Sequence, residues 1–134
     1  MKFIVYHSAF ESDIIEGEYN PNNPQGVDRL IKTLQDNNIS PDSNVYAELG
    51  STWRFLMTSP TQAAHVIGKL LKYVGENHVV WGTDSIWYGT PQDQITAFRA
   101  FQISAEFQET YGYPAMTSEI RDKVFGLNAA DAYG

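Results

Sequence analysis

The stretch that decides the fold is HVVWGTDSIWYGTP, residues 78–91. Three consecutive apolar residues, Val79 to Trp81, run directly into the triplet Gly82-Thr83-Asp84. Consecutive apolar positions are typical of parallel strands that are buried on both faces. A carboxylate, however, is costly to bury without a partner. We therefore predict a buried strand over residues 78–84 whose last residue faces a cation, hydrogen-bond donors or the water of a cleft.

Two further segments have the same strand-like character, residues 2–8 and 44–51. Helices are predicted where apolar residues recur at helical spacing, over residues 26–38, 59–75, 90–101 and 104–112, with one or two further turns within 117–134. The resulting order is β-α-β-α-β-α. Strands that alternate with helices predict an α/β fold with parallel strands. The stretches after the first two strands, residues 9–25 and 50–60, are long connections, and they follow the strand ends where such folds bind ligands.

Length and charge limit the classes of function. A chain of 134 residues fits a single domain over residues 1–134. Lys and Arg total 9 against 16 Asp and Glu, a net charge of -7, which is the wrong sign for binding nucleic acid or an anionic membrane surface. There is no cysteine, no signal peptide and no apolar run that could span a membrane. We therefore expect a cytoplasmic protein without nucleic-acid or membrane partners.

Three polar residues fall at or near the ends of the predicted strands: His7, Glu48 and Asp84. In a parallel sheet these ends meet at one rim. Histidine and carboxylate side chains there suit a divalent metal, or an acid/base pair acting on a metal-bound water. Each also has a structural alternative. Asp84 could serve as a helix cap or turn residue, His7 as a satisfied core histidine, and Glu48 as the ion-pair partner of Arg54.

Other candidates are weaker. Trp87 and Tyr88 follow Asp84 and could line a substrate pocket, although aromatic residues near strands also serve packing. His65 and His78 are expected to be structural, and the acidic residues of the first long loop are expected to form a solvated face: Glu11, Asp13 and Glu16. Phosphate-binding and serine-hydrolase motifs are absent.

Two longer segments carry a family resemblance. VVWGTDSIWYGTPQDQITAFRAF (79–101) and IRDKVFGLNAADAYG (120–134) resemble the C-terminal part of amidohydrolase-related metal-dependent hydrolases. This TIM-barrel group includes aminocarboxymuconate semialdehyde decarboxylase. Gly82-Thr83-Asp84 matches the end of the family's strand 8, and residues 123–130 match its closing helix. Residues 3–8 and 44–50 resemble strands 6 and 7, so the resemblance covers nearly the whole chain.

The resemblance implies a site and a chemistry. It implies that Asp84 binds a divalent metal, zinc in the first instance, and that His7 and Asp84 are catalytic. We expect Glu48, Trp87 and Tyr88 to contact the substrate. The implied reaction is hydrolysis or decarboxylation of a small molecule, so the class is hydrolase or lyase.

The chain also departs from the family pattern. It lacks the H-x-H of strand 1 and the histidine of strand 5, and one Asp with one His does not complete a metal site. Either a complementary N-terminal barrel half supplies the other ligands, or the chain is a non-catalytic, self-associating remnant without metal. The isolated chain is expected to be inactive. A flavodoxin-like binding domain ranks last, because no phosphate-binding loop is present.

A partial barrel of three strands has two open edges and an uncovered apolar face, which favour association. We therefore expect a homo-oligomer, or an open sheet whose exposed face is covered by helices.

Overall fold

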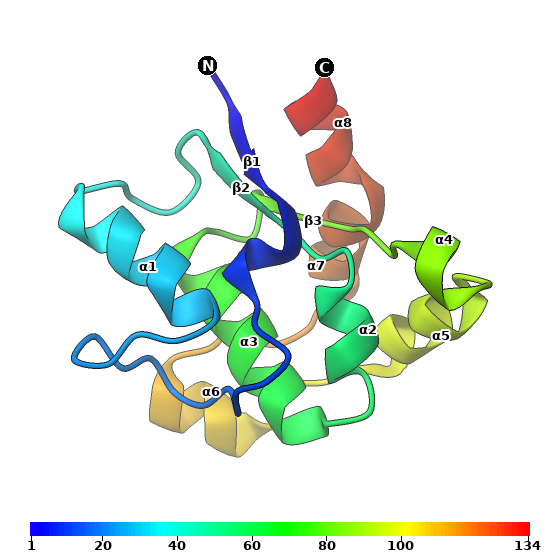
Figure 1. Cartoon of the computed structure of the whole chain (residues 1–134), viewed down its shortest axis with the longest axis horizontal. Helices are drawn as coiled ribbons and strands as arrows, with labels where there is room; N and C mark the ends of the chain where they lie inside the picture. The colour runs from blue at the N-terminus through cyan, green and yellow to red at the C-terminus, as the bar shows by residue number, and fades with distance from the viewer.

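Three short parallel strands form the centre of the computed structural model, which describes residues 1–134 (Figure 1). The strands β1 (Phe3–Val5), β2 (Val45–Glu48) and β3 (Val79–Val80) lie in the order β1-β2-β3. Phe3 pairs with Val45, and Ala47 pairs with Val79. This confirms the predicted α/β class with parallel strands, as in part of a TIM barrel. All three strands are shorter than predicted.

Two helices, α1 (Val27–Asp36) and α3 (Pro60–Tyr73), cover one face of this sheet. Their apolar side chains share one core cluster with Val45, Ala47 and Val79. The helix α3 begins with Pro60 at its first position, as predicted from Ser59-Pro60. Four further helices are α2 (Thr52–Leu56), α4 (Ser85–Tyr88), α5 (Gln92–Ala100) and α6 (Ala105–Tyr111). The helix α2 falls inside the predicted loop 50–60, and the short α4 was not predicted.

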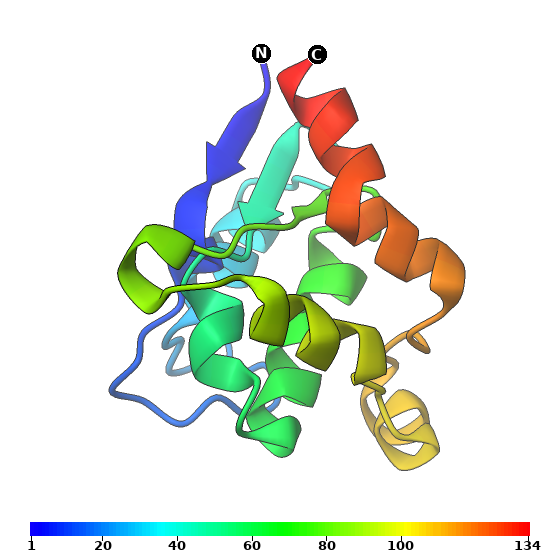
Figure 2. The same ribbon diagram turned by 90° about the vertical axis from the view of Figure 1, so that its right-hand side faces the viewer.

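The other face of the sheet is covered by the C-terminal segment (Figure 2). It comprises α7 (Ser118–Asp122), a π-helical turn η2 (Lys123–Leu127) and α8 (Asn128–Tyr133), which follow one another without a break and are longer than the predicted one or two turns. Side chains alternate along β2, so Tyr46 faces away from α1 and α3, and its hydroxyl donates to Asp131 of α8. Burial and this bond raise the pKa of Tyr46 to about 12. The sheet face opposite α1 and α3 therefore has a helical cover, as in the open-sheet alternative of the expectation.

The loop over residues 9–25 is fastened to the helices at Glu16. Glu16 is 3% exposed, and its Oε2 lies 2.8 Å from the Nζ of Lys69, which also lies 2.7 Å from Asp28 Oδ1. Glu16 Oε1 accepts a bond from the backbone N–H of Val27, at the start of α1. The predicted solvated face is thus wrong for Glu16, because a buried ammonium group lies within its reach.

Two histidines belong to the core, as predicted. His65 Nδ1 lies 2.9 Å from the hydroxyl of Tyr113, and the ring of His78 stacks on Tyr46. Burial is the main cause that lowers the pKa of His65, and the charge of Lys69 adds to it. None of the helices has the length and apolar content needed to cross a bilayer.

Candidate active site

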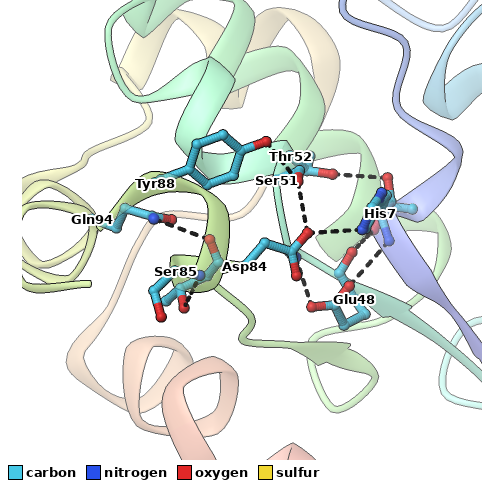
Figure 3. Close-up of polar contacts among 11 residues, drawn as sticks. His7, Glu48, Ser51, Thr52, Asp84, Ser85, Tyr88 and Gln94 are labelled. Atoms are coloured by element: carbon cyan, nitrogen blue, oxygen red, sulfur yellow. Dashed lines mark hydrogen bonds and ion pairs between the residues drawn. The ribbon is translucent and has the colours of Figure 1, made fainter. Parts of the chain in front are cut away.

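The ends of β1 and β3 place His7 and Asp84 in direct contact (Figure 3). His7 Nε2 lies 2.9 Å from Asp84 Oδ2, and the two side chains are 50% and 29% exposed. β2 lies between these two strands and contributes Glu48 to the same rim. The three residues predicted from the strand ends therefore share one site. The His–Asp pair is open enough to meet a ligand.

Left-handed backbone at the strand ends brings the pair together. His7 and Ser8 have φ of 60° and 52°, and Asp84 has φ of 50°. Such angles are unfavourable for residues other than glycine and cannot continue a strand, so the chain turns away from the strand direction at these residues. Two side-chain hydroxyls secure the turn after β1: Ser8 Oγ donates to the carbonyl of Glu48, and Thr52 Oγ1 donates to the carbonyl of His7.

Glu48 is buried beneath the pair. Its carboxylate accepts hydrogen bonds from backbone N–H groups and does not pair with a cation. Its Oε2 accepts from the His7 N–H at 3.1 Å, and its Oε1 accepts from the Gly50 N–H at 2.7 Å. The predicted alternative of an ion pair with Arg54 is wrong, because that guanidinium lies over the ring of Tyr88, 5.6 Å from its centroid. A substrate contact by Glu48 stays a prediction.

Ser51 is the site residue that the sequence reasoning missed. Its Oγ donates to Asp84 Oδ2 at 2.6 Å and lies 3.0 Å from the hydroxyl of Tyr88. Asp84 stands before α4 in a left-handed turn conformation, but its side chain caps no N–H of that helix, so the structure contradicts side-chain capping and leaves the turn alternative. The sequence feature that could have identified Ser51 as a site residue is its position three residues after Glu48, at the rim end of β2.

The two aromatic candidates point in different directions. Tyr88 reaches the pair through Ser51, whereas Trp87 is 78% exposed on α4. Their roles in substrate binding stay predictions.

The sequence model of one family, Amidohydrolase, matches residues 41–134. The chain belongs to the amidohydrolase family. The matched part includes Glu48, Ser51 and Asp84. His7 lies before the matched part, and only its contact with Asp84 assigns it to the site. No curated protein and no solved structure gave a match. In this amidohydrolase-family chain, Asp84 lies four residues after the end of β3.

Amidohydrolases usually use divalent metals, but the donor atoms at this rim already have partners within the chain. His7 Nε2 and Asp84 Oδ2 contact each other, and the same Oδ2 accepts from Ser51. Both carboxylate oxygens of Glu48 accept from backbone N–H groups. No three His, Asp or Glu side chains converge as metal ligands need to. The residues of this chain by themselves do not fit a complete metal centre.

Proposed function

We propose that this chain supplies the proton-transfer part of an amidohydrolase active site, which hydrolyses or decarboxylates a small molecule. The observation that carries the proposal is the 2.9 Å contact between His7 Nε2 and Asp84 Oδ2. A carboxylate that accepts from one ring nitrogen selects the tautomer in which the other nitrogen is a base. His7 Nδ1 is then the base that takes a proton from the attacking water or from the substrate.

The roles within the pair follow from their surroundings. Ser51 and His7 both donate to Asp84 Oδ2, so this oxygen is held in place on two sides. Asp84 orients the imidazole and stabilises its positive charge after proton uptake, as the carboxylate does in a catalytic triad. His7 is the more exposed of the two and meets the substrate.

The backbone around the pair supports a functional role. Seven non-glycine residues have positive φ, and five of them surround this rim: His7, Ser8, Ala9, Ser51 and Asp84. Each costs of order 1 kcal/mol or more, and such residues gather at active sites where the surrounding structure holds them. A purely structural turn would be built more cheaply with glycine.

The same proposal includes the type of reaction, the residues that contact the substrate and the metal. By resemblance to the group that includes aminocarboxymuconate semialdehyde decarboxylase, the reaction is hydrolysis or decarboxylation, and the expected compartment is the cytoplasm. Trp87 and Tyr88 would border the substrate, and Glu48 would keep the rim backbone in register beneath it. A divalent metal, zinc by the resemblance, would have only Asp84 as its predicted ligand here. Its other ligands would come from a complementary chain.

An activated ester tests His7 as a base without a metal, so it does not require the complete site that the isolated chain is expected to lack. p-Nitrophenyl acetate is offered to the chain in the presence of EDTA, and p-nitrophenolate release is followed. His7→Asn is expected to abolish the rate above that of free imidazole, and Asp84→Asn to lower it by about 10²-fold. Asp93→Asn, a change of an exposed residue on α5, is the matched control. A wild-type rate no higher than that of imidazole contradicts the proposal.

Metal analysis of the purified chain tests the zinc assignment. We expect little bound zinc, because one carboxylate does not retain it. Stoichiometric zinc that disappears in Asp84→Asn but persists in Asp93→Asn would show a complete metal centre within this chain, contrary to the proposal.

A further inference from the structure

Arg54 of α2 is a cation that has no acceptor within the chain. Seven of the nine Lys and Arg side chains donate to a carboxylate or to a backbone carbonyl: Lys2, Arg29, Lys32, Lys69, Lys72, Arg121 and Lys123. The other two are Arg54 and Arg99. Arg99 is exposed at the end of α5, whereas Arg54 is half-buried and comes three residues after Ser51 of the active site. Only Arg54 therefore belongs to the turn that contributes Ser51.

The ring of Tyr88 joins this guanidinium group to the active site. Tyr88 contacts three side chains from the start of α2: its hydroxyl lies 3.0 Å from Ser51 Oγ, and its ring contacts the guanidinium of Arg54 and the ring of Phe55. The single hydroxyl hydrogen of Ser51 goes to Asp84, so Tyr88 is the donor in its bond to Ser51 (Figure 3). The position of the Tyr88 ring is thus fixed by polar and apolar contacts together.

The contact with Tyr88 leaves Arg54 able to bind an anion. A cation–π contact needs no hydrogen-bond acceptor, so the N–H groups of the guanidinium stay without partners in the chain. Two of these N–H groups match the two oxygens of a carboxylate. Asp84 does not supply that carboxylate, because its Oδ2 contacts His7 and Ser51 and no ion pair joins it to Arg54.

The charge of the molecule makes such a cation necessary for an anionic ligand. The chain has a net charge of -7, and the carboxylates of Glu48 and Asp84 lie at the rim itself. This field repels anions from the site. A substrate that carries a carboxylate therefore needs a specific cation at the rim, and the free guanidinium of Arg54 is suited to that role.

We propose that Arg54 binds a carboxylate of the substrate, at a position remote from the bond that reacts. The inference rests on the proposed function and names its substrate class. The substrate is a small organic acid, with its reacting group at His7 and a further carboxylate at Arg54. Arg54 is then a residue that determines specificity, and Tyr88 positions it.

Two activated esters of equal chain length test this specificity. The mono-4-nitrophenyl ester of adipate carries a carboxylate, whereas 4-nitrophenyl hexanoate is neutral. After subtraction of the rates with free imidazole, wild type is expected to prefer the adipate ester in kcat/KM by about tenfold or more, because hydrogen bonds between charged groups are the strong ones. Arg54→Gln is expected to lose this preference through a higher KM for the adipate ester. Arg54→Lys should keep only part of it, because an ammonium group lacks the planar fork.

Arg99→Gln is the matched control, because it removes the other free guanidinium and changes the net charge equally. It is expected to keep the preference for the adipate ester. If wild type hydrolyses both esters equally well, or if Arg54→Gln and Arg99→Gln lose the preference equally, the inference is overturned.

Binding of adipate separates a failure of this inference from a failure of the proposed base. Adipate is titrated to millimolar concentration into the ¹⁵N-labelled chain, and NMR follows the Arg54 side-chain and Tyr88 amide resonances. Saturable shifts are expected in wild type, and shifts of the Tyr88 amide in Arg99→Gln. In Arg54→Gln the dissociation constant should rise about tenfold or more, while circular dichroism checks its fold.

The two outcomes can be told apart. If neither ester is hydrolysed but adipate binds through Arg54, the proposed base fails and the anion site stands. Adipate binding that is absent in wild type, or that persists unchanged in Arg54→Gln, overturns the anion site whatever the ester rates are.

Discussion

At the scale of single residues, the carboxylates show how one chemical group takes different roles in different surroundings. Asp84 stays partly exposed and faces an imidazole and a hydroxyl. Glu48 is buried and accepts from two backbone N–H groups. Glu16 is buried against the ammonium group of Lys69. Only the first leaves a charged side chain where a substrate could reach it, so only Asp84 is suited to chemistry.

Gly82 of the Gly-Thr-Asp triplet is required by the position of Glu48. A Cβ at position 82 would overlap Glu48 Oε1. We expect Gly82→Ala to displace Glu48 and to lower the free energy of unfolding by about 1–3 kcal/mol, measured by urea denaturation. Gly126→Ala is the matched control. A Cβ there meets nothing within 4 Å in a helical segment, so the change is expected to stabilise by about 0.5–1 kcal/mol. An equal effect of both substitutions would contradict this explanation.

His65 links stability to pH. Burial lowers its pKa in the folded chain below the ordinary value of about 6.5. The unfolded chain therefore binds a proton at a higher pH than the folded chain does. The resulting stabilisation is present above about pH 6.5 and is lost as the pH falls through the folded pKa. We expect the urea midpoint to fall less steeply between about pH 7 and pH 5 in His65→Gln than in wild type. If the urea midpoint falls equally steeply with pH in both proteins, groups other than His65 cause the loss of stability in acid.

At the scale of elements, the C-terminal helix serves as a substitute for a strand. The π-helical turn η2 widens the helix at residues 123–127, and there the carbonyl of Val124 accepts from the Trp81 N–H of β3. Asn128 follows one turn later and bonds the Val79 carbonyl. The family-like sequence K-V-F-G-L-N-A-A thus has a physical reason: its backbone and its Asn satisfy the outer edge of β3.

Asn128→Ala is expected to open this edge. The Val79 and Glu76 carbonyls both lose their donor, at a cost of about 1–3 kcal/mol in the free energy of unfolding. Hydrogen exchange at the Trp81 amide should become faster than in wild type. Asn37→Ala removes an exposed helix-end bond and should change stability by less than about 0.5 kcal/mol. Unchanged exchange at Trp81 would show that Asn128 does not hold the helix on β3.

At the scale of the whole molecule, one buried cation joins the long loop after β1 to the helices. Lys69 of α3 pairs with Glu16 of the loop and with Asp28 of α1. Because β1 leads through His7 into this loop, the cluster also limits the movement of the active-site turn. We expect this buried charge cluster to contribute more to a unique arrangement of loop and helices than to net stability.

Lys69→Met is expected to leave two buried carboxylates without a counter-charge and to destabilise by about 3–5 kcal/mol. Limited proteolysis should then cut within residues 9–25 before the rest of the chain unfolds. Lys32→Met, which removes an exposed pair with Asp36, is the control and should cost less than about 1 kcal/mol. Similar losses of stability in the two variants would argue against this role of the Lys69 cluster.

The sequence by itself determined the α/β class, the parallel strands and the rim position of His7, Glu48 and Asp84. Apolar runs and helix signals are local, and parallel strands bring their ends together in any fold of this class. Only the tertiary structure decided the partners: the Ser51 bond to Asp84, the burial of Glu16 against Lys69, and the helix on the outer edge of β3. These contacts join residues 33 to 53 positions apart. A local sequence pattern does not reveal these partners, because the energy of each contact depends on which groups the fold buries together.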